Sequence, residues 1–218
     1  MRTEFHARLE SMTCGLGEMC DLAGQAIQHA TRALLAVDMA AADRVVMDVD
    51  SISRRNTRVE REALVLLARQ APVARDLRAV VASLHIAADI DRMGGLAAHV
   101  ARTARRRHPS PAVPDEMNDR FAEMGRTAAE LASGASSIIM SGDPVQATTI
   151  RSRDEAMNSL NRELFAAVRS GWGHGVETAI DVILLGRFYE RFADHAVEIA
   201  RRVIFRTDGA HPEWSVSA

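Results

Sequence analysis

Carboxylates recur at a four-residue spacing near the end of the sequence, at Glu190, Asp194 and Glu198. On a helix this spacing places three like charges on one face along two turns, and each pair costs roughly a few tenths of a kcal/mol. Two interpretations stay open. Neighbours such as Arg187 could neutralise a solvated acidic face, or the carboxylate oxygens could bind a divalent or ferric cation.

A cation site of this kind needs ligands from a second helix, because one helix turn rarely supplies more than two or three of the six or so oxygens that hard cations prefer. Asp154 and Asn158 are also four residues apart, and we expect them to face Glu190 and Asp194 in an antiparallel hairpin. No Glu-x-x-His pair occurs, which excludes the ligand set of carboxylate-bridged di-iron enzymes. His195 points roughly 100° away from Asp194 around a helix and is a poor co-ligand.

Arginines gather near the ends of the third and sixth expected helices. The third helix ends with Arg102, Arg105, Arg106 and Arg107. These charges either compensate the helix dipole in solvent or form a docking patch for an acidic partner surface. No nucleophile with a base, Gly-rich phosphate loop or zinc pattern is present, so we expect a protein that is not an enzyme.

Six long helices are expected to position these side chains. Apolar residues recur at three- and four-residue steps, the period of a helix with one buried face. Helix ends are marked by Asp38 as an N-cap, by Pro72 and by a Gly-Trp-Gly break at 171–173. The expected helices span residues 3–37, 38–71, 72–107, 115–140, 144–170 and 175–206.

The chain also divides into two similar halves. Glu18-Met19 matches Glu123-Met124 at a constant offset, and three prolines between 108 and 114 exclude a helix at the midpoint. The fold class expected is all-α, with two tandem three-helix bundles of long antiparallel helices related by internal pseudo-symmetry. The expected divisions are a first repeat at 1–107, a linker at 108–114, a second repeat at 115–207 and a tail at 208–218.

Composition narrows the class of protein further. The 218 residues include 27 basic and 29 acidic side chains, and the net charge of −2 argues against binding nucleic acid through overall charge. No apolar stretch reaches the roughly 20 residues needed to span a bilayer, so no membrane insertion is expected. Cys14 and Cys20 match no metal or redox spacing, which fits a reducing cytoplasm.

Three segments resemble the PhoU family of phosphate-transport regulators, and most closely its actinobacterial PhoY branch. They are Gln-Ala-Pro-Val-Ala-Arg-Asp-Leu-Arg at 70–78, Asp-Ile-Asp-Arg-Met-Gly at 89–94 and Glu-Arg-Phe-Ala-Asp-His at 190–195. The resemblance implies a negative regulator of phosphate uptake and of the phosphate-starvation response. Such proteins act as adaptors between the ATPase subunit of the phosphate ABC transporter and the cytoplasmic region of a sensor histidine kinase.

The resemblance also implies a cytoplasmic homodimer, recruited to the inner face of the plasma membrane, that binds metal ions such as iron, zinc or magnesium. Its metal motifs match the second repeat, at Glu190, Asp194, Asp154 and Asn158. In the first repeat only Asp91 is retained, while Gly95 and Ser53 replace the other acids. We therefore expect tight metal binding in the second repeat and weak binding at Asp91, because ligand number and charge set the affinity. The alternative is a metal-binding or metal-dependent helical bundle with an unrelated role.

Two adjacent glycines, Gly94 and Gly95, interrupt the third expected helix. Each costs about 1 kcal/mol relative to Ala inside a helix. We expect the loss to be offset by close helix approach, which the missing Cβ allows. A kink and a notch for a docking partner are the alternatives.

Overall fold

The computed structural model describes residues 2–143 and 145–209. Within them there are six long α-helices and one short 3₁₀ turn, η1, and no residue forms a β-strand, which confirms the all-α class. None of these helices is both long and apolar enough to cross a membrane. The elements are α1 (Arg2–Ala36), α2 (Met39–Gln70), α3 (Ala74–Arg107), η1 (Asp115–Met117), α4 (Asn118–Ser141), α5 (Gln146–Arg169) and α6 (Gly175–Asp208).

Helix boundaries follow local chemistry. The Asp38 carboxylate accepts a 3.0 Å hydrogen bond from the Ala41 N–H and caps α2, as predicted. Pro72 separates α2 from α3, although α3 begins two residues later than expected. Gly142 ends α4 in a left-handed conformation, with φ of 66°. The expected start of the fifth helix, Pro144, and the tail after residue 209 lie outside the described residues.

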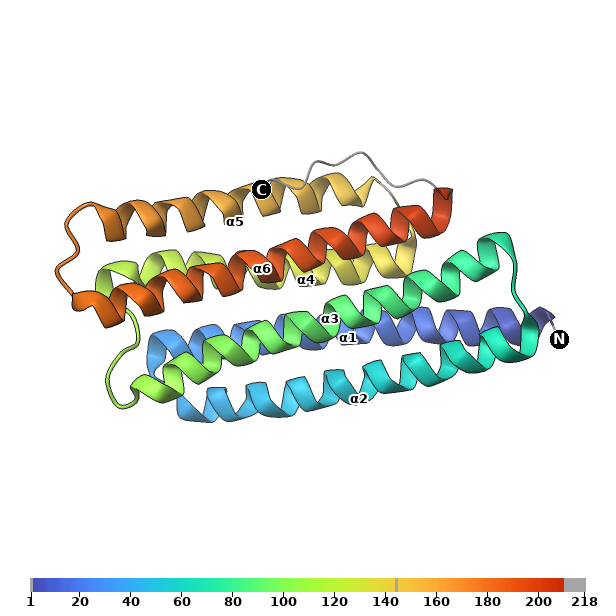
Figure 1. The fold of residues 1–218 in the computed structure, drawn as a ribbon, viewed down its shortest axis with the longest axis horizontal. Helices are drawn as coiled ribbons and strands as arrows, with labels where there is room; N and C mark the ends of the chain where they lie inside the picture. Colours follow the sequence, from blue (N-terminus) through green and yellow to red (C-terminus); the bar gives the residue numbers. More distant parts are fainter. Residues whose placement is uncertain (1, 144, 210–218) are drawn as a thin grey trace.

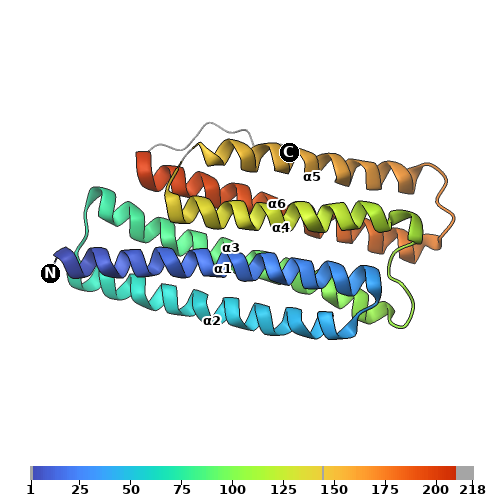
Figure 2. The same ribbon diagram turned by 180° about the vertical axis from the view of Figure 1, so that it is seen from behind.

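The helices form an elongated bundle of two three-helix groups (Figure 1). α1 packs along α4 and α3 packs along α6, so these four helices join the two groups. α2 packs on α1 and α3, while α5 packs on α4 and α6. Figures 1 and 2 show α2 and α5 on opposite outer sides of the bundle, which leaves each with one face toward solvent.

One continuous apolar core runs through both groups. The bond between Tyr189 of α6 and Thr31 of α1, 2.7 Å long, lies inside this core. Thr31 already donates to the Ile27 carbonyl, so the Tyr189 hydroxyl is the donor. The segment 108–114 contains no helix, but Ala112 and Val113 are buried in the same core. This connection therefore packs against the bundle and is not a solvated tether.

Glycines mark the places where helices approach most closely. A Cβ added to Gly94 would lie 3.1 Å from Ile52 Cδ1, in agreement with the close approach expected there. At Gly95 no atom lies within 4 Å of the added Cβ, so the same expectation is wrong for that residue. Gly125 is the tightest case, because its Cβ would lie 2.5 Å from Thr31 Oγ1 across the contact between α1 and α4.

These two environments predict opposite effects of the same substitution. Gly95→Ala should raise the free energy of unfolding by about 0.5–1 kcal/mol, because Ala favours the helix and meets open space. Gly125→Ala should lower it by about 1–3 kcal/mol, because the methyl group overlaps Thr31. Urea unfolding of both variants beside the parent checks this. Changes of the same sign in the two variants would show that packing between α1 and α4 does not limit the size of the side chain at residue 125.

Candidate functional site

The acidic residues predicted in the second repeat meet where α5 packs against α6. The Asn158 side-chain amide donates a 3.1 Å hydrogen bond to Asp154 Oδ2, one turn away on α5. Glu190 and Asp194, one turn apart on α6, border a groove of about 740 Å³ that Asn158 also lines. The structure therefore brings together all four residues that the sequence singled out.

The carboxylates lie within one another's fields in a partly buried setting. Burial, followed by the charge of Asp194, raises the pKa of Asp154 to about 6, although the hydrogen bond from Asn158 acts in the opposite direction. Burial and then the charge of Glu190 likewise raise the pKa of Asp194, while Arg191 opposes the shift. Burial is the largest cause of both shifts, and repulsion between the neighbouring carboxylates adds to it.

Arginines of α6 compensate part of this charge. Arg187 donates a hydrogen bond to Glu190, and Arg191 Nη1 lies 3.8 Å from Asp194 Oδ2. Among the residues that the structure describes, Asp154 has no arginine partner, and its Oδ1 atom is buried without a hydrogen bond. A solvated acidic face therefore accounts for Glu190 and Asp194 but not for Asp154.

Two observations bear on whether these residues fit a cation. Among the described residues no three His, Cys, Asp or Glu side chains converge closely enough to hold a metal ion. Against this, the unpaired Asp154 Oδ1 is costly to leave buried. The unpaired Asp154 oxygen has more weight than the lack of convergence, because Glu190 and Asp194 are half-buried and can change rotamer at a lower cost than that of the unpaired oxygen. The donor set fits a hard cation in type and charge, and side-chain movement is needed to close it.

The first repeat shows a different arrangement at the equivalent place. Asp91 is half-buried, and its carboxylate accepts a 2.7 Å hydrogen bond from Ser53, the residue that replaces the acid on α2. Gly95 contributes no ligand one turn later. Asp48, which lies nearby on α2, bonds instead to His29 at 2.8 Å. Asp91 thus has a neutral hydrogen-bond partner and no facing acid.

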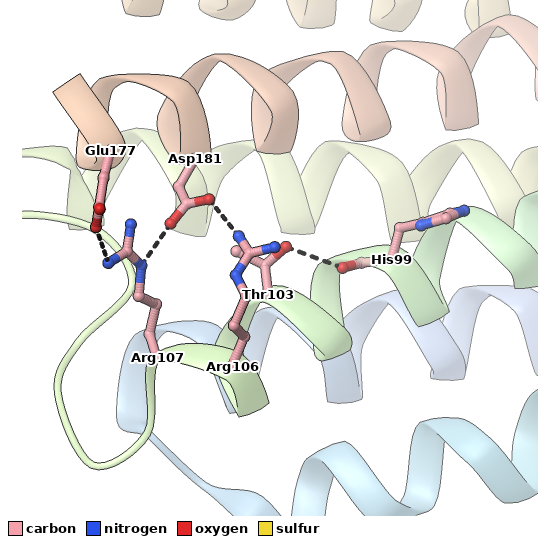
Figure 3. Close-up of polar contacts among 6 residues, drawn as sticks. All are labelled: His99, Thr103, Arg106, Arg107, Glu177 and Asp181. Atoms are coloured by element: carbon pink, nitrogen blue, oxygen red, sulfur yellow. Dashed lines mark hydrogen bonds and ion pairs between the residues drawn. The ribbon is translucent and has the colours of Figure 1, made fainter.

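The arginines at the end of α3 make bonds within the molecule. Arg106 and Arg107 both donate to Asp181 of α6, and Arg107 also reaches Glu177 at 3.2 Å (Figure 3). Arg105 lies 3.2 Å from Asp43 of α2. The docking patch predicted at residues 102–107 remains a prediction, but Arg106 and Arg107 already have a structural role.

A second buried carboxylate links α3 to α6 in the middle of the bundle. Asp89 accepts a 2.8 Å hydrogen bond from Arg202 Nε and lies 3.1 Å from His195 Nδ1. His195 is therefore a core histidine directed at α3, away from the acids of α5. Sequence reasoning missed both Asp89 and Asp181. The available signal was a single acid on an otherwise apolar helix face, such as Asp89 with Ile86 three residues before it and Met93 four residues after it.

Comparison with known proteins identifies the family. The family model for the PhoU domain matches residues 16–104, within α1 to α3, and 121–203, within α4 to α6. The chain belongs to the PhoU family. A PhoU homolog 1 of Mycobacterium leprae, named a phosphate-specific transport system accessory protein, is 54% identical over 98% of this chain and 96% of its own length. A PhoU homolog 2 of Mycobacterium tuberculosis is 54% identical over 97% of this chain and 100% of its own length.

Solved PhoU structures share the fold. PhoU from Pseudomonas aeruginosa superposes with a TM-score of 0.82 at 25% identity, covering 94% of this chain and 100% of its own. The phosphate transport system regulatory protein PhoU from Streptococcus pneumoniae gives a TM-score of 0.79 at 20% identity, covering 98% and 99%. The helical arrangement is thus that of other PhoU proteins.

The raised pKa of Asp154 predicts a pH-dependent effect on the stability of this PhoU protein. The folded state binds the Asp154 proton more tightly than the unfolded state, so stability falls as pH rises from about 4 to about 6. Asp154→Asn has no titrating group at this position, so it does not lose this stability. The free energy of unfolding of the variant minus that of the parent should therefore increase by about 1 kcal/mol between pH 4 and pH 7, after allowance for partial exposure. Urea unfolding of both proteins in the presence of a chelator measures this difference. A difference that does not change with pH would contradict the raised pKa of Asp154.

Proposed function

We propose that this protein is an accessory regulator of phosphate transport that represses phosphate uptake and the phosphate-starvation response. The observation that carries the proposal is the PhoU match in both halves, together with relatives 54% identical that are named phosphate-specific transport system accessory proteins. We further propose that it works in the cytoplasm as a non-enzymatic adaptor. Its partners there are the ATPase subunit of the phosphate ABC transporter and a sensor histidine kinase.

The shape and surface chemistry of the bundle support an adaptor. Long helices packed on one core give a stiff body with extended side faces, to which two proteins can bind at once. Arg102 is exposed near the end of α3 and forms no ion pair in the described residues, whereas Arg105 pairs with Asp43, and Arg106 and Arg107 are bonded to Asp181. Within the predicted docking patch, Arg102 is therefore the residue that best suits an acidic partner surface. The homodimer stays a prediction.

We also propose that a cation binds in the second repeat. Asp154, Glu190 and Asp194 would hold it, and a cation there would supply the positive charge that the buried Asp154 oxygen lacks. Binding would tie α5 to α6 and stiffen the outer helix of this repeat. Iron, zinc and magnesium are the candidates, and oxygen-only donors favour the harder ions.

Deletion of the gene tests the regulatory role. In a strain without paralogues, phosphate-starvation genes should be expressed in phosphate-rich medium at the level of starved cells, and the wild-type gene should restore repression. Pull-down should recover the transporter ATPase and the kinase's cytoplasmic region. Arg102→Glu should weaken this recovery and Arg8→Glu, an exposed residue of α1, should not. Unchanged expression after deletion would reject the regulatory role.

Metal analysis tests the cation site separately. Purified native protein should contain or take up metal, and Glu190→Ala combined with Asp194→Ala should abolish it, because two of three carboxylates are lost. Asp91→Ala in the first repeat is the matched control and should leave the metal content unchanged. Equal metal content in all three proteins would refute the proposed ligands.

A further inference from the structure

Arginines and acids meet at several levels along the contact between α3 and α6. At one end, Arg106 and Arg107 of α3 donate to Asp181 of α6 (Figure 3). In the middle, the roles are reversed, because Arg202 of α6 donates to Asp89 of α3. At both levels each cation has a carboxylate from the opposite helix. The charges are therefore balanced locally, as buried ionic groups require.

The other end of the same contact lacks this balance. There α3 contributes Arg75 and Arg78, and α6 contributes Arg206, but no ion pair involves any of the three in the part of the chain that the structure describes. The Arg78 Nε atom is buried without a hydrogen-bond partner. Burial, followed by the charge of Arg75, lowers the pKa of Arg206, so the main charge effect on this group comes from another cation.

Within residues 2–143 and 145–209, Arg206 donates its hydrogen bonds to neutral groups. Its Nη1 donates to Thr13 Oγ1 at 3.4 Å and its Nη2 donates to the Ile139 carbonyl at 3.1 Å. A guanidinium has five N–H donors, so three are left. Together with Arg75, Thr13 and Ser141, Arg206 lines a cavity of about 670 Å³ at the end of the bundle where α6 ends and α3 begins (Figure 1).

On the α3 side of the cavity local helix structure adds to the positive potential, whereas the carboxyl ends of α4 and α6 oppose it. α3 begins at Ala74 after Val73, which provides no side-chain cap, so the first N–H groups of this long helix are not bonded by a capping side chain. The positive end of the helix dipole therefore coincides with two arginines in the first turns. Two acids line the same cavity, the exposed Glu10 and the half-buried Asp76. Asp76 lies 3.8 Å from His6, and neither acid forms an ion pair with the three arginines in the described residues.

We propose that Arg75 and Arg206, with the Thr13 hydroxyl, bind a phosphate dianion in this cavity, either as inorganic phosphate or as a small phosphomonoester. A phosphate group supplies the missing negative charge and has oxygens pointing in several directions, which suits guanidinium groups that approach from two helices. A single carboxylate would satisfy fewer donors and carry half the charge. The inference concerns phosphate binding alone. A protein that fails to bind phosphate could still have the proposed regulatory role, so the two failures are separate outcomes.

Equilibrium dialysis and isothermal titration of the full chain at low ionic strength test the site. Inorganic phosphate should bind saturably, and Arg75→Gln and Arg206→Met should each weaken it at least about tenfold, because each removes a charged donor. Arg58→Gln, an exposed arginine of α2 bonded to Glu62, is the matched control and should bind like the parent. A parallel titration with glycerol phosphate distinguishes inorganic phosphate from a phosphomonoester, since the ligand that binds more tightly is the form that the site prefers.

Thermal unfolding provides a second measurement that does not depend on affinity alone. Phosphate should raise the melting temperature of the parent and of Arg58→Gln but not that of Arg206→Met. Without phosphate, Arg206→Met should melt close to the parent, because removal of an unbalanced cation offsets the loss of the hydrogen bonds to Thr13 and the Ile139 carbonyl. Arg75 is exposed, so Arg75→Gln keeps the test valid if Arg206→Met does not fold. Absence of saturable binding, equal binding by all variants, or equal stabilisation by chloride would overturn the proposal.

Discussion

Close approach of α1 to α4 is the constraint on which the rest of the molecule depends. Gly125 leaves room for the Thr31 side chain, and a Cβ on Gly24 would lie 3.3 Å from that of Ala132. The Thr31 hydroxyl is buried by this approach and is satisfied by its own helix and by Tyr189. Because the backbones come this close, the two three-helix groups share one core and do not behave as separate domains.

With α1 against α4, polar groups set the position of α3 on α6. Asp181 lies on α6 and receives arginines from α3, while Asp89 lies on α3 and receives Arg202 from α6. Buried ionic groups of this kind contribute little net stability compared with apolar packing, but an unpaired one is costly. They therefore disfavour any sliding of the two helices that would leave Asp89 or Asp181 unpaired.

The two repeats differ in the charge that they leave uncompensated. In the second repeat Asp154 retains a buried oxygen without a partner, whereas Asp91 in the first is satisfied by Ser53. The contact between α3 and α6 shows the opposite deficit at its end near Arg206, where no acid compensates the arginines in the described residues. The two repeats thus share a helical plan and differ in the polar residues at equivalent places.

The sequence by itself determined which segments form helices and that Asp154 faces Glu190. Apolar periodicity and caps such as Asp38 act within a few residues, and an antiparallel hairpin brings neighbouring helices into a predictable relation. Only the tertiary structure decided that Arg107 meets Asp181, 74 residues later in the chain. That partnership depends on how far α3 slides along α6, which is set by packing across the whole core and not by any local pattern.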